Sequence, residues 1–412
     1  TSLSETFPYA LTEGARFHLA TVSTAVGGIP YLIDQDVNGY LFQPGDWQAL
    51  GNDLAALGND DELRRRLGEK LYEKASTQFS IQKTVSTQLQ IYASILRRHR
   101  RRSSARDGVV ICGAYGRGNA GDDAILEAIL QEMRSIDPDM PITVLSKDPR
   151  STRLTYRVRA VHRSNFLAWH AAMWNSRLYI NGGGSLIQDV TSRRSLWFYL
   201  ANIRAAKRAG NRVQMYGCGI GPVTRESHRS LAAKIINKYV DVITLREPDS
   251  LEELRAMGVT EPEVLLTADP ALILQKAPDD ETDSVLLRAG IPPHGNYLCF
   301  ALRRWKGFEE KAPLFSRMQA VVSMRLHALI FAAGQGIPLA GVVYDPKVSA
   351  FLRYIGQEQF VDLAELTGQN LCAMMDQCVA QAAHPEAQAA AVRNLQAMEQ
   401  KNVEVARRLL KG

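Results

Sequence analysis

Short apolar runs alternate with longer amphipathic segments between residues 108 and 275. The runs have the length of buried strands, whereas the longer segments repeat apolar residues every three or four positions, as helices do. This alternation predicts a parallel sheet with helices on both faces, a Rossmann-like domain. The expected strands are 109–113, 142–145, 178–181, 213–217, 242–245 and 264–267, and the expected helices lie near 122–136, 165–175, 194–209, 225–239 and 248–257.

A second, smaller α/β unit follows, and other helices flank the two units. Its expected strands are 297–302, 320–323 and 339–343, with a helix at 326–334. A final helix begins after Pro385, runs to about Leu410 and suits docking on either unit. Upstream, 61–76 and 81–96 have helical spacing. The predicted segments are 1–96, a basic linker at 97–107, an N-terminal Rossmann-like domain at 108–278, a second domain at 279–383 and a C-terminal helix at 384–412.

Composition excludes several classes of protein. The chain has 412 residues, of which 46% are hydrophobic and 22% charged, an ordinary globular composition. It has no run of about 18 apolar residues and no signal-peptide pattern at its start, so we expect neither a membrane span nor secretion. The five cysteines form no Cys-x-x-Cys pair, which favours a reducing cytoplasm and predicts no zinc site.

The net charge of +6 comes from one segment. Residues 97–106 hold six arginines and no acidic residue, so the remaining 402 residues are formally neutral. We interpret the basicity as local to this segment, and not as a nucleic-acid-binding surface. The segment suits a solvated linker or a peripheral contact with anionic lipid.

Three glycine-rich loops follow strands of the predicted sheet, at 113–122, 181–185 and 217–222. Open α/β sheets bind ligands at the carboxyl ends of their strands, where backbone N–H groups approach an anion. Neither the dinucleotide fingerprint nor a Walker A motif is present. Polar side chains on the same edge are candidates for hydrogen bonds to sugar hydroxyls, although Asp122 equally suits a helix cap. These are Asn119, Asp122, Gln188, Asp189 and Arg193.

A basic cluster is predicted in the second unit. Arg325 and His327 begin a helix after a strand, and Lys347 follows the next strand. Arg246 ends a strand of the first domain and would face them. Two arginines, a lysine and a histidine suit a small, multiply charged anion. A structural ion pair for Arg325 and a half-buried position for His327 are the alternatives.

At these residues the chain from about 108 to 360 resembles the polysaccharide pyruvyl transferases, most closely the CsaB type. The resemblance rests on Gly-Asn-Ala-Gly-Asp-Asp-Ala-Ile-Leu (118–126), Asn-Gly-Gly-Gly-Ser-Leu-Ile-Gln-Asp (181–189), Gly-Ile-Gly-Pro-Val (219–223), Leu-Arg-Glu-Pro-Asp-Ser (245–250), Ala-Asp-Pro (268–270), Met-Arg-Leu-His-Ala-Leu-Ile-Phe-Ala (324–332) and Tyr-Asp-Pro-Lys-Val (344–348). In this combination and order the motifs are highly specific.

The resemblance implies a GT-B-like fold and transfer of pyruvate from phosphoenolpyruvate to sugar hydroxyls as a 4,6-ketal, with release of phosphate and no cofactor. The implied acceptor is a β-N-acetylmannosamine of a lipid-linked cell-wall precursor, whose product serves S-layer anchoring. From the cysteine content and the basic segment at 97–106 we expect the enzyme in the cytoplasm, peripheral on the inner face of the plasma membrane. The positions that match donor-binding residues are Arg246, Arg325, Leu326, His327 and Lys347.

For this chemistry we expect His327 to be the general acid and Asp122 or Asp189 to be the base that takes a hydroxyl proton. No metal is expected, because no His-x-x-x-His or Asp-x-Asp pair lies on the predicted edge. One departure concerns length: only 18 residues separate Trp305 from Met324, where the family has further strand–helix units. Either a segment near 306–318 is omitted, which we favour, or the chain is a shortened and inactive variant.

Residues 1–96 resemble the C-terminal half of the nucleotide-binding domain of family 4 glycosyltransferases. The match rests on Glu5 and Glu13 in a Glu-x7-Glu pattern, then Gly-Gly-Ile-Pro at 27–30 and Pro-Gly-Asp at 44–46. His18-Leu-Ala20 replaces the family's Gly-x-Pro, so we expect a remnant that does not transfer sugar by itself. The alternatives to a pyruvyl transferase are a nucleotide-sugar-dependent glycosyltransferase and a non-catalytic scaffold near the membrane.

Overall fold

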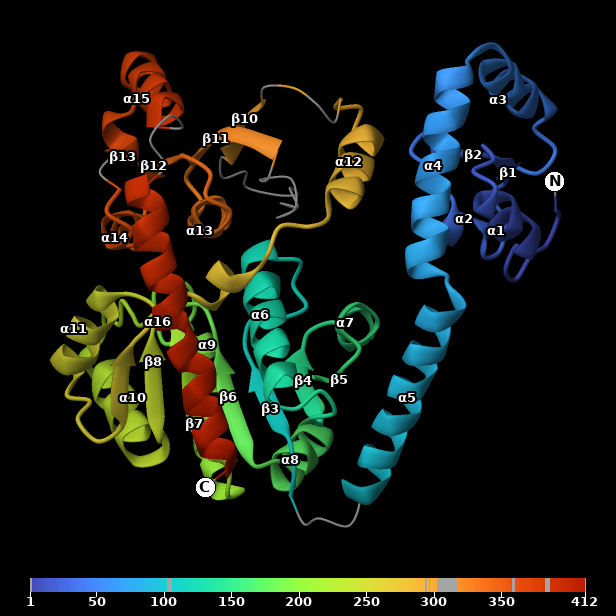
Figure 1. Cartoon of the computed structure of the whole chain (residues 1–412). Helices are drawn as coiled ribbons and strands as arrows, with labels where there is room; N and C mark the ends of the chain where they lie inside the picture. Colours follow the sequence, from blue (N-terminus) through green and yellow to red (C-terminus); the bar gives the residue numbers. More distant parts are fainter. Residues whose placement is uncertain are drawn as a thin grey trace. The chain divides into compact units, whose positions relative to one another are not determined.

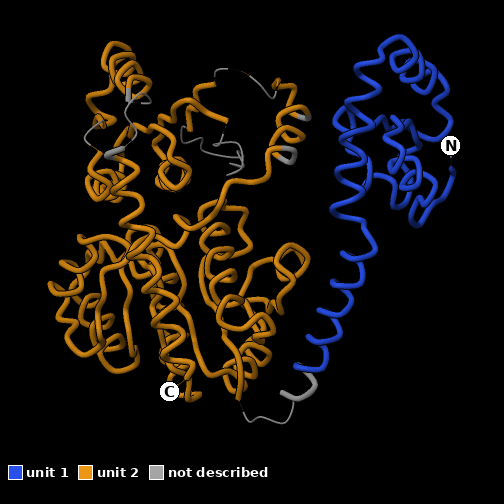
Figure 2. Tube along the Cα trace, viewed as in Figure 1, with its two compact units in different colours: residues 1–102 blue, residues 103–412 orange. Residues whose placement is uncertain are grey.

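The computed structural model describes residues 2–101, 106–292, 295, 297–301, 317–357, 360–381 and 386–411. Contacts divide the chain into two compact units, residues 1–102 and residues 103–412 (Figure 2). The second unit contains both of the larger sheets. The Arg-Trp motif at 303–305 and residues 306–316, on which the expectation of an omitted segment rests, lie outside the described residues.

The first unit is a small α/β unit. Its parallel strands are β1 (Val22–Thr24) and β2 (Tyr40–Phe42), and its helices are α1 (Tyr9–Arg16), α2 (Ile29–Leu32), α3 (Trp47–Asn59), α4 (Asp61–Gln78) and α5 (Ile81–Arg101). Its core is formed by Ala15, Ile29, Leu32, Ile33 and Leu71. Helix α5 begins where the sequence predicts but continues past residue 96 to Arg101, into the arginine-rich segment.

A seven-stranded parallel sheet forms the larger half of the second unit (Figure 1). Its strands are β3 (Val109–Cys112), β4 (Ile142–Ser146), β5 (Arg159–His162), β6 (Leu178–Gly182), β7 (Arg212–Cys218), β8 (Val242–Leu245) and β9 (Glu263–Leu266). Their order is β5-β4-β3-β6-β7-β8-β9, so the direction of winding changes between β3 and β6. Ligands bind at this point in open α/β sheets. Six of these strands were expected, and β5 was not.

Helices cover both faces of this sheet because the residues of each buried strand alternate between the faces. Val109 and Ile111 of β3 share a core with α6 (Ala120–Ile136), whereas Val110 and Cys112 pack with the helices on the opposite face. The opposite face carries α8 (Phe166–Asn175), α9 (Arg193–Arg208), α10 (Glu226–Tyr239) and α11 (Pro248–Met257). One further helix, α7 (Pro149–Tyr156), precedes β5.

A second parallel sheet has the order β10-β11-β12-β13. Its strands are β10 (Tyr297–Ala301), β11 (Met318–Ser323), β12 (Leu339–Val343) and β13 (Phe360–Asp362). The helices around it are α12 (Asp279–Arg288), α13 (Leu326–Gly334), α14 (Pro346–Tyr354) and α15 (Gly368–Gln381), and the short helices η1 (Pro270–Ile273) and η3 (Leu363–Glu365) complete the unit. The predicted fold class, two Rossmann-like parallel sheets with a C-terminal helix, is confirmed.

The last helix, α16 (Glu386–Lys411), bridges the two sheets (Figure 1). Val392 and Leu395 in its first half and Val403 and Ala406 in its second half belong to one buried cluster. That cluster also contains residues of β3 and β11, so it is shared by both sheets. The helix therefore docks on both halves of the second unit, which answers the question that its sequence left open.

Two buried carboxyl groups lie where α16 packs on α6. Glu132 of α6 is 5% exposed and Glu399 of α16 is fully buried. The Tyr216 hydroxyl donates to Glu132, and the Asn402 amide donates to Glu399 at 3.0 Å. Burial raises the pKa of both carboxyl groups, and the charge of Glu399 raises that of Glu132 further.

This pair predicts that the fold loses stability as the pH rises above about 5. Unfolded glutamate titrates near pH ~4.3, so above that pH the folded chain keeps protons that the unfolded chain has lost. We expect the free energy of unfolding to fall between about pH 5 and pH 8, and Glu132→Gln to flatten the slope by up to about 1.4 kcal/mol per pH unit. Urea denaturation across this range measures it, with the exposed Glu127→Gln of the same helix as control. Equal slopes in Glu132→Gln and the unaltered chain would contradict the prediction.

Candidate active site

A cavity of about 710 Å³ lies between the carboxyl edge of the seven-stranded sheet and the second sheet. Four helices begin at its wall, because its lining includes first-turn or capping residues of α6, α11, α13 and α14. The N-terminus of a helix carries partial positive charge and unpaired N–H groups, both of which attract anions. The cavity is therefore an anion-binding environment before any charged side chain is considered.

The first glycine-rich loop ends in a cap that also positions a carboxyl group. Asn119 caps α6 by accepting from Gly121 N–H at 3.1 Å, and its amide donates to Asp122 Oδ2 at 2.7 Å. Asp122 lines the cavity. Burial raises the pKa of Asp122 to about 6, and the neighbouring Asp123 adds to the rise. At neutral pH this carboxylate is a stronger proton acceptor than an ordinary aspartate, which suits a general base.

Two glycines near Asp122 leave room for neighbouring side chains to pack closely. Gly183 has φ +64°, and a Cβ there would lie 2.0 Å from Ile125 of α6, so only glycine lets the second loop approach the helix. A Cβ at Gly121 would lie 2.1 Å from Nδ1 of His327. The first turns of α6 and α13 are therefore in close contact in the wall of the cavity.

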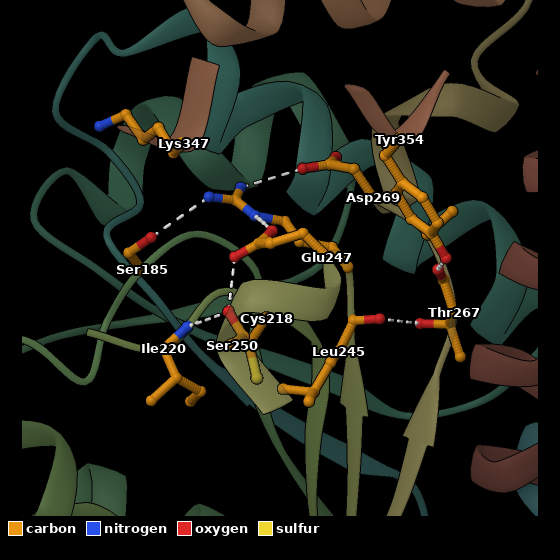
Figure 3. A network of polar contacts seen from close by, with 12 residues as sticks. Ser185, Cys218, Ile220, Leu245, Glu247, Ser250, Thr267, Asp269, Lys347 and Tyr354 are labelled. Carbon is orange, nitrogen blue, oxygen red and sulfur yellow. Dashed lines mark hydrogen bonds and ion pairs between the residues drawn. The ribbon is translucent and has the colours of Figure 1, made fainter. Parts of the chain in front are cut away.

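Arg246 is held by two carboxylates and a hydroxyl (Figure 3). Its Nε donates to Glu247 at 2.7 Å, and its terminal nitrogens donate to Asp269 at 3.0 Å and to Ser185 at 3.2 Å. Burial alone would lower the pKa of Arg246, but Glu247 and Asp269 raise it overall. Arg246 lines the cavity as predicted, with three of its five N–H groups engaged within the protein.

His327 stands against the same network. Its Nε2 lies 4.0 Å from Asp269 Oδ2 and is buried without a hydrogen bond to a described residue. Burial lowers the pKa of His327 to about 4, with Arg246, Lys347 and Arg325 contributing and Asp269 opposing. His327 is therefore neutral at pH 7 in this environment, whereas a general acid must carry a proton when the donor is bound.

The remaining predicted donor residues also line the cavity. Arg325 is the N-cap residue of α13, with its backbone N–H donating to Ser323 at 2.8 Å, and Leu326 follows it. Lys347 stands in the first turn of α14, 3.0 Å from Asp345. The structure thus brings Arg246, Arg325, Leu326, His327 and Lys347 to one cavity.

The acceptor candidates separate into two groups. Asn119, Asp122 and Gln188 line the cavity, whereas Asp189 and Arg193 are not among its lining residues. Asp189 accepts from the backbone N–H and hydroxyl of Thr224, from Arg225 N–H and from His228 Nδ1 at 2.8 to 3.2 Å. Burial would raise the pKa of Asp189, but these hydrogen bonds lower it overall. Asp189 therefore anchors its loop to the start of α10, and the geometry favours Asp122 as the base.

Three groups in the network were not predicted: Ser185, Glu247 and Asp269. Glu247 and Asp269 lie in the Leu-Arg-Glu-Pro-Asp-Ser and Ala-Asp-Pro motifs. These motifs place both residues at the edge of the sheet but do not indicate that they pair with Arg246. Glu247 also accepts from Ser250 at 2.6 Å, and Ser250 in turn accepts from Ile220 N–H at 2.8 Å. The motifs at the ends of β7, β8 and β9 are thereby tied together.

Among the described residues, no three histidine, cysteine or acidic side chains gather as a group able to hold a metal ion. Nor does any helix in the described ranges combine the length and apolar character needed to cross a bilayer.

The fold is shared with a sugar-nucleotide-binding protein of known structure. The Anabaena protein HepE, solved in complex with UDP-glucose, superposes with a TM-score of 0.51 at 9% identity, covering 73% of this chain and 99% of that one. At this identity the likeness shows the fold alone, the GT-B-like α/β architecture of transferases.

Sequence comparison then identifies the family. The profile of polysaccharide pyruvyl transferases matches residues 119–346, more than half of the chain and nearly all of the cavity-lining residues. The chain belongs to the polysaccharide pyruvyl transferase family. This family is one of transferases that modify polysaccharides.

The first unit belongs to a different lineage. Residues 1–74 match glycosyl transferases group 1. N-acetyl-alpha-D-glucosaminyl L-malate synthase of Bacillus anthracis is 35% identical over 96 residues, which are 23% of this chain and 25% of that protein. O-antigen chain mannosyltransferase C of Escherichia coli is 32% identical over 94 residues, with the same shares. The chain thus spans about a quarter of the length of these relatives, and the predicted resemblance of the N-terminal residues to glycosyltransferases is confirmed.

Proposed function

We propose that this protein transfers pyruvate from phosphoenolpyruvate to a sugar, with β-N-acetylmannosamine of a lipid-linked cell-wall precursor as the acceptor, forming a 4,6-ketal and releasing phosphate. The observation that carries the proposal is the convergence of Arg325, His327 and Lys347 on a cavity that also holds Asp122. Phosphoenolpyruvate presents a carboxylate and a phosphate, and four helix N-termini with two cationic side chains suit that pair of anions.

The proposed chemistry has four steps, and the groups in the cavity supply its proton transfers. His327 protonates the methylene carbon of phosphoenolpyruvate, which leaves positive charge at C2. A sugar hydroxyl attacks C2 and gives its proton to Asp122. The C2–O bond to phosphate then breaks, and phosphate leaves with the electron pair. The second hydroxyl closes the ketal at C2 and gives its proton to the imidazole of His327, which the first step left neutral. No cofactor or metal is part of this proposal.

We expect donor binding to raise the pKa of His327, so that the imidazole carries the proton that a general acid needs. The negative charges of bound phosphoenolpyruvate offset Arg325 and Lys347, whose charges lower the pKa of His327. Asp269 lies 4.0 Å from Nε2 of His327, and its negative charge also raises the pKa of His327. We therefore give Asp269 a positioning role: it holds Arg246 and favours the imidazolium.

That role predicts a shifted pH profile. In Asp269→Asn the amide oxygen can still cap Ala271 N–H, but the negative charge 4.0 Å from His327 is lost. Since an opposite charge at this distance is worth about one pKa unit, the alkaline limb of kcat should move about one unit toward acid. A pH–rate profile measures it. An unmoved limb with only a lower kcat would mean that Asp269 is purely structural.

The experiment that tests the function measures phosphate release from phosphoenolpyruvate with and without a lipid-linked β-N-acetylmannosaminyl acceptor. We expect release only when both are present, and a product heavier than the acceptor by one ketal-linked pyruvate. Release of nucleotide from a UDP-sugar without phosphoenolpyruvate would instead favour a glycosyltransferase, for which the match at residues 1–74 is the supporting observation. If neither activity is detected, the remaining candidate function is a non-catalytic scaffold.

The acceptor side of the proposal rests on Asn119, Asp122 and Gln188, which line the cavity. Because such acceptors are assembled on the inner face of the plasma membrane, we place the protein in the cytoplasm at that surface. Pyruvylated product would then serve S-layer anchoring.

A further inference from the structure

A shallow apolar groove lies on the outer surface of α8, α9 and α10, on the helix layer that covers one face of the seven-stranded sheet. Its volume is about 460 Å³. The residues that define this tryptophan groove include Trp174, Trp197, Arg204, Arg208, Leu231 and Ile235. Trp174 is 61% exposed and Trp197 is 58% exposed. Large aromatic side chains this exposed are unusual on a surface that faces only water.

The aromatic strip continues along α8. Phe166 and His170 precede Trp174 at spacings of four residues, so all three lie on one face of the helix. Phe166 and the adjacent Leu167 are exposed, at 64% and 87%. Helix α8 has no charged side chain. Its outer face is therefore apolar and aromatic, with no lysine or glutamate to keep it in water.

Basic residues lie on both sides of this apolar strip along the chain, and the surrounding segment contains almost no acidic residue. Residues 157–225 contain eleven arginines and lysines but a single acidic residue, Asp189. Asp189 is buried and hydrogen-bonded, so it does not offset the surface charge. The guanidinium groups of Arg204 and Arg208 make no hydrogen bond or ion pair with other residues that the structure describes, and both side chains lie exposed in the groove. The interpretation that basicity is confined to 97–106 is therefore wrong: acidic residues elsewhere balance a second basic region.

We propose that the tryptophan groove docks on the surface of an anionic phospholipid bilayer. Tryptophan places its ring at the level of lipid headgroups, and arginine buries its apolar stem there while its guanidinium pairs with phosphate. Asp241 pairs with Lys207 and Arg212 of this region, but Arg204 and Arg208 lie exposed in the groove itself. An excess of basic over acidic side chains matches a continuous anionic surface. A protein partner of defined shape would instead be met by alternating charges on the groove rim.

The groove is also next to the cavity mouth. Val190 and Thr191 line the cavity, and the chain passes from them directly into the first turn of α9. That turn carries Arg193 and Arg194, and Trp197 stands one turn further on. A bilayer held against this face would present lipid-linked molecules beside the cavity. This docking needs no chemistry, so it stands or fails independently of the proposed reaction.

Co-sedimentation of the full chain with vesicles tests the proposal. We expect binding to phosphatidylcholine vesicles that contain phosphatidylglycerol and little binding to phosphatidylcholine alone. The variant Trp174→Ser/Arg204→Gln/Arg208→Gln should bind roughly tenfold or more weakly. The matched control, Trp47→Ser/Arg65→Gln/Arg255→Gln, changes an exposed tryptophan and two exposed arginines outside the groove and should bind as the unaltered chain does.

Three results would overturn the inference. The first is no binding to anionic vesicles. The second is full binding by the groove variant, with all loss arising when the arginines of 97–106 are neutralised. The third is a change from dimer to monomer in the groove variant with vesicle binding intact, because the groove would then be an interface between copies of this chain. Circular dichroism and thermal unfolding of each variant exclude loss of folding as the cause of weaker binding.

Discussion

Replacing His327 with glutamine should lower kcat for phosphate release by about 10²- to 10⁴-fold, the usual contribution of a general acid. Glutamine occupies similar space beside Gly121 but cannot deliver a proton to carbon. Because Arg325 and Lys347 remain, the KM for phosphoenolpyruvate should change far less than kcat. Steady-state kinetics with saturating acceptor measure both constants, and His327→Ala should give a loss of the same order.

The exposed His162→Gln, on β5 away from the cavity lining, is the matched control and should leave both constants unchanged. Near-normal turnover by His327→Gln and His327→Ala would end the general-acid assignment. A large rise in KM with unchanged kcat would make His327 a donor-binding residue instead.

Replacing Arg246 with methionine should destabilise the second unit by about 3–5 kcal/mol. Arg246 is 5% exposed, and its removal leaves the buried Asp269 and the partly buried Glu247 without their counter-charge. Breaking a buried pair in this way costs far more than removing both partners. Urea denaturation measures the loss, and the double variant Arg246→Met/Asp269→Asn should recover part of it because one unpaired carboxylate is gone.

Arg255→Met, an exposed arginine of α11, is the control and should stay within about 0.5 kcal/mol of the unaltered chain. If Arg246→Met is equally stable and only raises the KM for phosphoenolpyruvate, Arg246 acts through the donor alone. Both effects together would mean that the two N–H groups left over from the network also hold the donor.

Buried parallel strands were predictable because their apolar runs are continuous. Six strands of the large sheet lie where expected, whereas β5 was missed because only Ala160 and Val161 are buried in it. Helix α14 was not predicted, because Asp345-Pro-Lys347 was interpreted as a candidate site and not as the N-cap and first turn of a helix. Local pattern thus located the elements that carry a full apolar face and missed those at the edges.

The site was predictable where motifs end strands of one sheet, since topology alone brings those ends together. Sequence does not tell which way a polar side chain turns after a strand. Asp122 faces the cavity, whereas Asp189 turns beneath its loop toward His228. The pairing of Arg246 with Asp269 joins neighbouring strands 23 residues apart, and no local pattern encodes such a pair. Net charge hid the basic region at 157–225 for a similar reason, because a sum over the chain averages regions that the fold separates.

The helices that begin at the cavity wall have a consequence for how donor affinity responds to conditions. Histidine and lysine lose their charge as the pH rises, and salt weakens the attraction of exposed cations for an anion. The partial positive charge of the backbone N–H groups at the starts of α6, α11, α13 and α14 does not titrate. Anion affinity should therefore persist at alkaline pH after turnover has stopped. Binding and catalysis would then separate on the pH axis, leaving an enzyme that is occupied but idle.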